Sequence, residues 1–151
     1  TNKKQVAKVE MRFIANISNP LDLGAMIICV RALTGTHDFF NFYSSGSNVK
    51  STIRTISTCE LSVVNPHDIF TGQVLFPIPG DLHSCYQFKI EANGFLKQII
   101  RHIVSALWMV GSGKISTDEF MTLLNGPANP NQLWKVAGPN GLFLYRVNYP
   151  D

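Results

Sequence analysis

The chain has 151 residues, of which 45% are hydrophobic and only 15% charged, and its 13 Lys and Arg against 10 Asp and Glu give a net charge of +3. This apolar content excludes an intrinsically disordered protein, and the length suits one domain that buries its own core. The small positive charge permits an anionic partner but is far below that of a histone-like binder.

The first third of the chain predicts a strand, a helix and a loop. Residues 6–14 alternate polar and apolar side chains, which is typical of a half-buried strand. We expect the next helix to have Asn19 as its N-cap and Pro20 at its first position, and to end before Gly35. Residues 36–51 are first aromatic and then rich in Ser, Gly and Asn, so they predict an ordered loop.

Two further strands are predicted in the middle of the chain. Residues 52–64 are dense in Thr, Ile and Val, and residues 84–92 alternate Tyr, Phe and Ile with Gln, Lys and Glu. We expect these two strands to pair antiparallel. Residues 65–81 between them hold several prolines and predict a long hairpin connection or an insertion.

The last third predicts two helices and a final strand. Apolar residues at helical spacing predict one long helix from Gly94 to Gly111 with a wide apolar face. Ser116 and Glu119 have the spacing of a capping box, which opens a short second helix. A strand over residues 142–149 completes the order β-α-β-β-α-α-β. This order predicts an α+β fold with a mainly antiparallel sheet and helices packed on one face.

Several function classes lack their usual residues in this sequence. It contains no GxGxxG, GxxxxGK[ST], GxSxG or HExxH motif, the signatures of dinucleotide, P-loop, hydrolase and zinc-protease sites. Cys29, Cys59 and Cys85 are odd in number and far apart, which indicates neither a disulfide framework nor a zinc site and favours a reducing cytoplasm. The apolar residues 95–110 carry charged side chains, which excludes a membrane span.

Arg101 is the first candidate functional residue, because it falls at the margin of the apolar face of the long helix. A planar guanidinium at that position can hold a carboxylate or a phosphate through two hydrogen bonds. Lys97, Arg101 and His102 would then form a phosphate-facing edge. The alternative is a solvated helix side, with Arg101 extending its stem over the apolar surface.

The aromatic loop supplies a second candidate site. Its rings, hydroxyl groups and positive charges together suit nucleic-acid binding through stacking and phosphate contact. We expect its phenylalanines to be core anchors, and Lys50 and Arg54 to contact the nucleic acid. His37 and Asp38 are adjacent, so their side chains diverge, and Asp38 is expected to cap a turn rather than to form a catalytic dyad.

Several blocks of the sequence occur in a fixed order and at characteristic spacings. They are Leu33-Thr34-Gly35-Thr36-His37-Asp38-Phe39 with Phe42, Arg54-Thr55-Ile56, Ala92-Asn93-Gly94-Phe95-Leu96-Lys97-Gln98-Ile99-Ile100-Arg101-His102-Ile103-Val104, Val110-Gly111-Ser112-Gly113, and Gly141-Leu142-Phe143-Leu144 with Val147 and Tyr149. In this combination the chain resembles the C-terminal half of the TruA family of tRNA pseudouridine synthases.

The resemblance implies a catalytic domain of two halves, each built on an RRM-like or ferredoxin-like sheet, that meet at a basic cleft. It implies a homodimer that needs no cofactor and isomerises uridines of the tRNA anticodon stem-loop, usually at positions 38, 39 and 40. The family's catalytic aspartate lies in the first half, in a GRTDxGVHA-like motif that is absent from this sequence. Residues 1–151 would therefore be the C-terminal half of a longer enzyme and would be inactive alone.

The resemblance also assigns roles to single residues. Arg101 matches the family's active-site arginine, which pairs with the catalytic aspartate, and RNA contacts are then expected from Lys50, Arg54, Lys97 and Arg101. The sequence departs from the family where Tyr43 replaces a common arginine and where His102 replaces a common asparagine. The remaining alternatives are a stand-alone ferredoxin-like RNA-binding module and a structural dimerisation domain.

Overall fold

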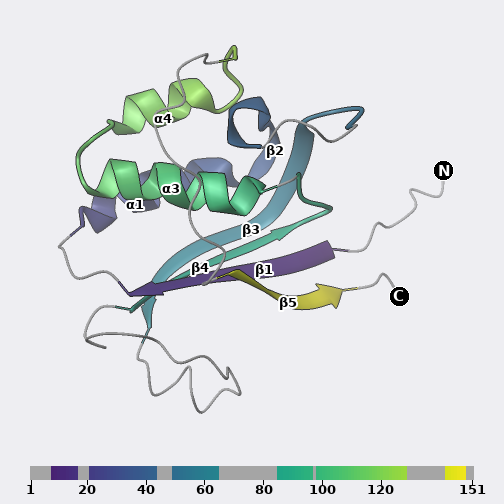
Figure 1. The fold of residues 1–151 in the computed structure, drawn as a ribbon, viewed down its shortest axis with the longest axis horizontal. Helices are drawn as coiled ribbons and strands as arrows, with labels where there is room; N and C mark the ends of the chain where they lie inside the picture. Colours follow the sequence, from purple (N-terminus) through teal and green to yellow (C-terminus); the bar gives the residue numbers. More distant parts are fainter. Residues whose placement is uncertain are drawn as a thin grey trace.

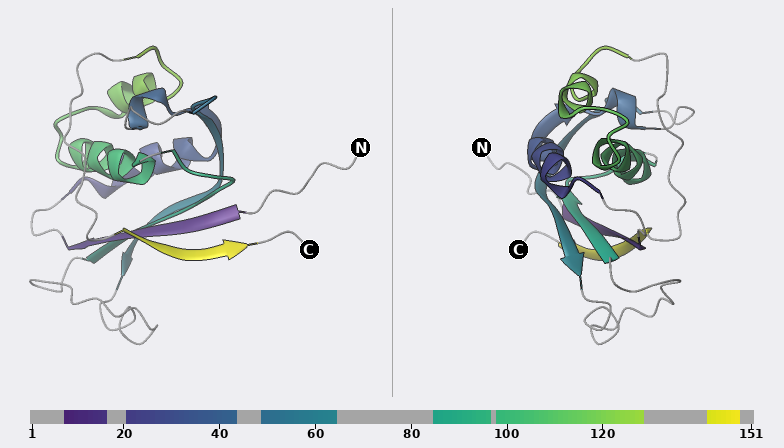
Figure 2. Two further views of the ribbon diagram at one scale, coloured as in Figure 1. Left: turned by 45° about the vertical axis from the view of Figure 1, so that its right-hand side comes forward. Right: turned by 90° about the vertical axis from the view of Figure 1, so that its left-hand side faces the viewer.

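The structure is a computed structural model that describes residues 8–16, 21–43, 49–64, 85–96, 98–128 and 142–148. Its elements are, in chain order, β1 (Lys8–Asn16), α1 (Leu23–Leu33), β2 (Gly35–Asp38), the 3-10 helix η1 (Phe40–Phe42), β3 (Ile53–Val64), β4 (Cys85–Ala92), α3 (Ile99–Gly111), α4 (Thr117–Leu123) and β5 (Leu142–Asn148). The strands form one sheet in the order β2-β3-β4-β1-β5, in which all neighbours are antiparallel. The helices lie on one side of this sheet (Figures 1 and 2), which confirms the predicted α+β fold.

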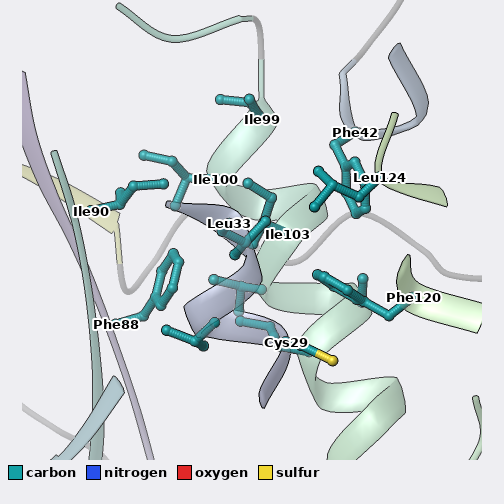
Figure 3. Packing of buried hydrophobic residues seen from close by; sticks show 14 of the residues in the cluster. Cys29, Leu33, Phe42, Phe88, Ile90, Ile99, Ile100, Ile103, Phe120 and Leu124 are labelled. Atoms are coloured by element: carbon teal, nitrogen blue, oxygen red, sulfur yellow. The ribbon is translucent and has the colours of Figure 1, made fainter. Parts of the chain in front are cut away.

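The core lies between the sheet and the helices. Along β4 the side chains of Phe88 and Ile90 are fully buried, and the alternating Gln87, Lys89 and Glu91 are only half-buried, as the pattern predicts. In Figure 3 these two side chains approach Leu33 of α1 from the sheet side, while Phe120 and Leu124 close the opposite side. The predicted antiparallel pairing of the strands over 52–64 and 84–92 is confirmed as β3 and β4.

The start of α1 differs from the prediction. The helix begins at Leu23, and its N-cap is Asp22, whose side chain accepts a hydrogen bond of 3.1 Å from the amide of Ala25. The assignment of Asn19 as the N-cap is therefore wrong, and Asn19 and Pro20 both lie outside the described residues. A carboxylate can take this role because it accepts one of the free amides of the first turn and opposes the positive end of the helix.

The loop predicted over residues 36–51 begins as a strand. Residues 35–38 form β2, which pairs with β3 from Gly35 opposite Ile56 to Asp38 opposite Ile53. Four residues at a sheet edge are too few to establish an alternating pattern, so the sequence did not reveal them. The predicted connection over 65–81 and Tyr149 lie outside the described residues.

The long helix is shorter than predicted, because α3 begins at Ile99 rather than at Gly94. Asn93 instead continues the contact of β4 with β3. Its backbone amide donates to the carbonyl of Thr55 at 3.4 Å, and its side-chain Oδ1 accepts from the amide of Thr55 at 3.3 Å. The helix α4 opens as predicted, since the Ser116 hydroxyl accepts from the amide of Glu119 at 3.0 Å.

A buried carboxylate lies on the sheet face that points away from the helices. Glu10 is only 1% exposed and alternates along β1 with Met11, which packs on the core. Its Oε2 lies 3.4 Å from Nη2 of Arg12, and its Oε1 lies 3.5 Å from Nζ of Lys89 on β4. A buried charge is costly unless it is paired, and the Glu10–Lys89 pair adds one side-chain contact to the pairing of β1 with β4 on that face.

The helices α1 and α3 lie close together at Gly111. A Cβ atom placed there would lie 2.5 Å from the sulfur of Met26 and 3.2 Å from Cβ of Leu21. The carbonyl of Gly111 also accepts a hydrogen bond of 2.8 Å from the amide of Asp22, which ties the end of α3 to the start of α1. Met26 is fully buried, so its side chain can move only by displacing the core residues packed around it.

This contact predicts the effect of a single added methyl group. Gly111→Ala should lower the free energy of unfolding by about 1–3 kcal/mol, because overpacking forces α1 and α3 apart. Gly94→Ala is the matched control, since no atom lies within 4 Å of its added Cβ. Urea denaturation of both variants measures the difference. Equal stability of the two variants would show that the helix contact is not tight.

Candidate nucleic-acid interface

Two of the predicted RNA-binding cations lie at the beginning of β3. Lys50 is exposed and Arg54 is half-buried. Nη1 of Arg54 donates hydrogen bonds of 2.7 Å to the carbonyls of Ser51 and Ile53, which hold the guanidinium against its own strand. In the described part of the chain, no carboxylate is bonded to Lys50 or Arg54. Both positive charges are therefore available to an anion.

Arg101 is placed by an unusual start of α3. The N-cap Gln98 has φ 60° and ψ 14°, a left-handed conformation that costs a non-glycine residue on the order of 1 kcal/mol. Its carbonyl accepts the amide of His102 at 3.0 Å, which opens the helix directly after this turn. Ile99 and Ile100 are then buried in the core at 2% and 3% exposure, and this sets the rotation of the helix. Arg101 emerges half-buried from its first turn.

The prediction that His102 belongs to a phosphate-facing edge is wrong. His102 is 3% exposed and forms part of the buried side of α3. Burial, followed by the positive charge of Arg101, lowers its pKa below the usual value of 6.5. A neutral buried imidazole cannot attract a phosphate. Of this edge the structure therefore describes one cation that reaches the surface, the half-buried Arg101, because Lys97 lies outside the described residues.

The aromatic loop divides its phenylalanines between the core and the surface. Phe39 and Phe42 are fully buried, as predicted for core anchors, and Phe42 packs on the ring of Phe120 at 5.7 Å between centroids. Phe40 contradicts the prediction, because it is 45% exposed. The reason is the 3-10 turn of η1, which directs one ring outward while its neighbours point to the core. The sequence gives no indication of which of these three phenylalanines is exposed.

Asp38 caps the turn into η1, as predicted. Its Oδ1 accepts the amide of Phe40 at 3.1 Å and the hydroxyl of Thr52. The neighbouring His37 is hydrogen-bonded to the segment after α4, since Nδ2 of Asn125 donates to Nδ1 of His37 at 2.7 Å. The amide orientation of Asn125 is fixed by its Oδ1, which accepts the amide of Asp38 at 2.7 Å. His37 and Asp38 therefore have structural roles here, and sequence reasoning missed their partner Asn125, 87 residues away.

The structure gathers these candidates at one end of the domain. The start of β3, the helix η1 and the first turn of α3 lie at the end where β4 finishes (Figures 1 and 2), and η1 packs against α3. We call this region, with Lys50, Arg54 and Arg101, the basic end. Positive groups beside an exposed ring can attract phosphates and stack on a base, which is what binding of single-stranded nucleic acid requires.

Other kinds of site receive no support from the described residues. Among them no group of three His, Cys, Asp or Glu could hold a metal ion, and no helix is long and apolar enough to cross a membrane. Burial raises the pKa of Cys29 to about 11, and burial together with Glu60 raises that of Cys59 still further. Both thiols are therefore protonated at neutral pH and are poor nucleophiles.

Comparison with known proteins gives one consistent result. The sequence profile of the family described as tRNA pseudouridine synthase matches residues 29–150. The tRNA pseudouridine synthase A proteins of Streptococcus pneumoniae strains P1031, Hungary19A-6 and CGSP14 are each 33% identical over 133 residues. The alignments cover 87% of this chain and 46% of each relative, so the chain spans about half the length of the curated relatives it matches.

The buried His102 predicts a pH dependence of stability. Its pKa is lower in the folded than in the unfolded state, so the unfolded chain binds more protons once the pH falls through about 6.5. The free energy of unfolding should therefore decrease between pH 7.5 and 5.5, and His102→Asn should make that decrease smaller. Urea denaturation across this range measures both slopes. Equal slopes for the two proteins would show that the pKa of His102 is the same in the folded and the unfolded state.

Proposed function

The chain belongs to the tRNA pseudouridine synthase family, and from that premise we propose that it is the C-terminal half of an enzyme that isomerises uridine to pseudouridine in tRNA. The family match over residues 29–150 carries this proposal. An isomerisation adds and removes no atoms, so the reaction needs no co-substrate. The proposed substrate sites are uridines 38, 39 and 40 of the anticodon stem-loop.

In this proposal the chain completes an active site whose aspartate belongs to the other half of the enzyme. Arg101 supplies the positive charge, because it is half-buried and extends from the first turn of α3 at the basic end. A half-buried guanidinium can orient a carboxylate through two parallel hydrogen bonds and keep it ionised. Gln98 and the buried Ile99 and Ile100 hold the backbone from which Arg101 extends.

The basic end then serves as the approach surface for tRNA. Lys50 and Arg54 are proposed to contact backbone phosphates, together with Lys97 and Arg101. Since phosphate contacts fix register without reading bases, these residues would contribute affinity rather than choice of uridine. The full enzyme is proposed to be a homodimer and to act in the cytoplasm, where tRNA is available and where the free thiols of Cys29 and Cys59 stay reduced.

The proposal predicts the activity of the protein encoded by the complete reading frame. That protein should form pseudouridine in an unmodified tRNA transcript, and the chain of residues 1–151 alone should form none. Arg101→Ala should slow turnover at saturating tRNA about a hundredfold or more, because the reacting site loses a positioned charge. Arg101→Lys should recover only part of the rate, since it keeps the charge and loses the planar fork.

The controls separate activity from folding. Arg31→Ala removes an exposed arginine of α1 and should leave turnover at saturating tRNA unchanged. Thermal melting of each variant checks the fold. A complete protein without pseudouridine formation would refute the proposed function, and it would favour the stand-alone RNA-binding module if that protein still bound tRNA. Normal turnover of Arg101→Ala would give Arg101 a structural role.

The phosphate contacts predict a second, independent result. Lys50→Ala combined with Arg54→Ala should weaken tRNA binding by a similar factor for different tRNA sequences, and it should reduce the slope of log affinity against log salt by about one to two. Filter binding over a salt series measures the slope. Lys114→Ala, which removes an exposed lysine beyond the opposite end of α3, is the matched control and should change neither quantity. An unchanged slope in the double variant would place the phosphate contacts elsewhere.

A further inference from the structure

Phe40 is an aromatic side chain that the fold places on the surface. Three large apolar side chains of the described residues are exposed, and of these Ile28 and Ile53 are aliphatic and Phe40 is aromatic. Phe40 is 45% exposed although Phe39 and Phe42, on either side of it, are completely buried. Single exposed apolar residues are common in proteins and carry no meaning by themselves. What distinguishes Phe40 is its surroundings: a fixed turn, a second ring and nearby positive charge.

The turn that carries Phe40 is fixed from several directions. The amide of Phe40 donates to Asp38 at 3.1 Å, and the side-chain amide of Asn41 donates to the carbonyls of Leu123 and Pro127 at 3.0 and 3.1 Å. The buried ring of Phe42 holds the turn from below. An exposed ring on a fixed turn loses little conformational freedom when it binds a ligand. Binding therefore carries only a small entropy cost for ordering the loop.

A second ring supports the first. The rings of Phe40 and Tyr43 meet edge to face, with 5.9 Å between their centroids and 66° between their planes. Tyr43 is half-buried, so it braces Phe40 and leaves nearly half of the Phe40 surface in solvent. A braced, outward ring of this kind is suited to stacking against another flat aromatic group.

The neighbours of Phe40 identify what that flat group is. The amide of Phe39 donates to the carbonyl of Thr52 at 3.0 Å, which continues the β2–β3 pairing and brings the chain before Thr52, with Lys50 and Ser51, alongside Phe40. No carboxylate of the described residues is bonded to Lys50 or Arg54. An exposed ring on a turn that lies next to the chain carrying Lys50 matches a nucleotide, whose base stacks while its phosphate meets the positive charge.

We infer that Phe40, braced by Tyr43, stacks on an unpaired base of the RNA that binds the basic end. The inference rests on the proposed function, which supplies tRNA as the nucleic acid. Phe40 is thereby a specificity-determining contact for RNA with an exposed base, whereas Lys50 and Arg54 bind any phosphate backbone. The alternative occupant is a protein surface, because Ile53, opposite Asp38 in the β2–β3 pairing, is exposed as well, and light scattering distinguishes the two occupants.

The test compares variants of Phe40 in the complete protein, with an unmodified tRNA transcript as the probe. Phe40→Ala should weaken binding about five- to a hundredfold, the range that loss of one stacked base covers. Phe40→Leu should lose nearly as much, because it keeps an apolar surface but has no aromatic face, and Phe40→Trp should bind at least as tightly as the wild type. Ile28→Ala, at an equally exposed aliphatic residue of α1, is the matched control and should bind normally.

The salt dependence separates this contact from the phosphate contacts. Loss of a neutral ring should lower affinity by the same factor at about 50 and 200 mM salt, whereas loss of a cation changes the slope. Normal binding by Phe40→Leu would overturn the inference even if Phe40→Ala were unstable. A lower molar mass in light scattering for Phe40→Ala, with unchanged tRNA affinity, would also overturn it and would assign the ring to a protein contact.

Failure of this inference and failure of the proposed function give different results. If the wild-type protein forms pseudouridine and the Phe40 variants bind tRNA normally, the stacking contact is absent and the proposed function stands. If the wild-type protein binds tRNA but forms no pseudouridine, the proposed function fails. In that case the order of affinities among the Ala, Leu and Trp variants still decides whether Phe40 stacks on a base.

Discussion

The burial of α3 is the constraint on which the rest of the domain depends. Ten residues of this helix are buried, and they include the apolar Ile103 and the titratable His102. A helix with so little solvent-facing surface must be covered from more than one direction. The sheet covers it from below, α1 and α4 pack beside it, and η1 packs against it. The first turn is where a charged side chain, that of Arg101, can leave the helix.

The features that the sequence predicted are those with a local cause. The alternation along β4 follows from having one buried face, and the capping box at Ser116 satisfies amides within a single turn. The left-handed Gln98 has no such cause, because glutamine does not favour that conformation and packing of Ile99 and Ile100 imposes it. The segment between β4 and α3 was predicted as helix for a related reason, since Phe95 and Leu96 have helical spacing with the residues that follow.

The candidate site shows the same division between local and distant causes. Arg101, Lys50 and Arg54 could be singled out from the sequence as cations beside apolar segments, and the structure brings the elements that carry them to one end of the domain. The exposure of Phe40 depends on contacts of Asn41 with residues more than eighty positions later. The sequence around the three phenylalanines does not include these distant partners, so all three were predicted to be buried.

The pairing of the first strand with the last has a consequence for synthesis of the chain. One edge of β1 joins β4, and the other joins β5, with Lys8 opposite Asn148. As the polypeptide leaves the ribosome, β1 can pair with β4 well before β5 has been translated. Until then β1 is an open sheet edge, the kind of surface at which chains associate wrongly. The exposed Lys8 and the half-buried Arg12 of β1 place positive charge at that edge, and charged side chains at an open edge disfavour its pairing with another chain.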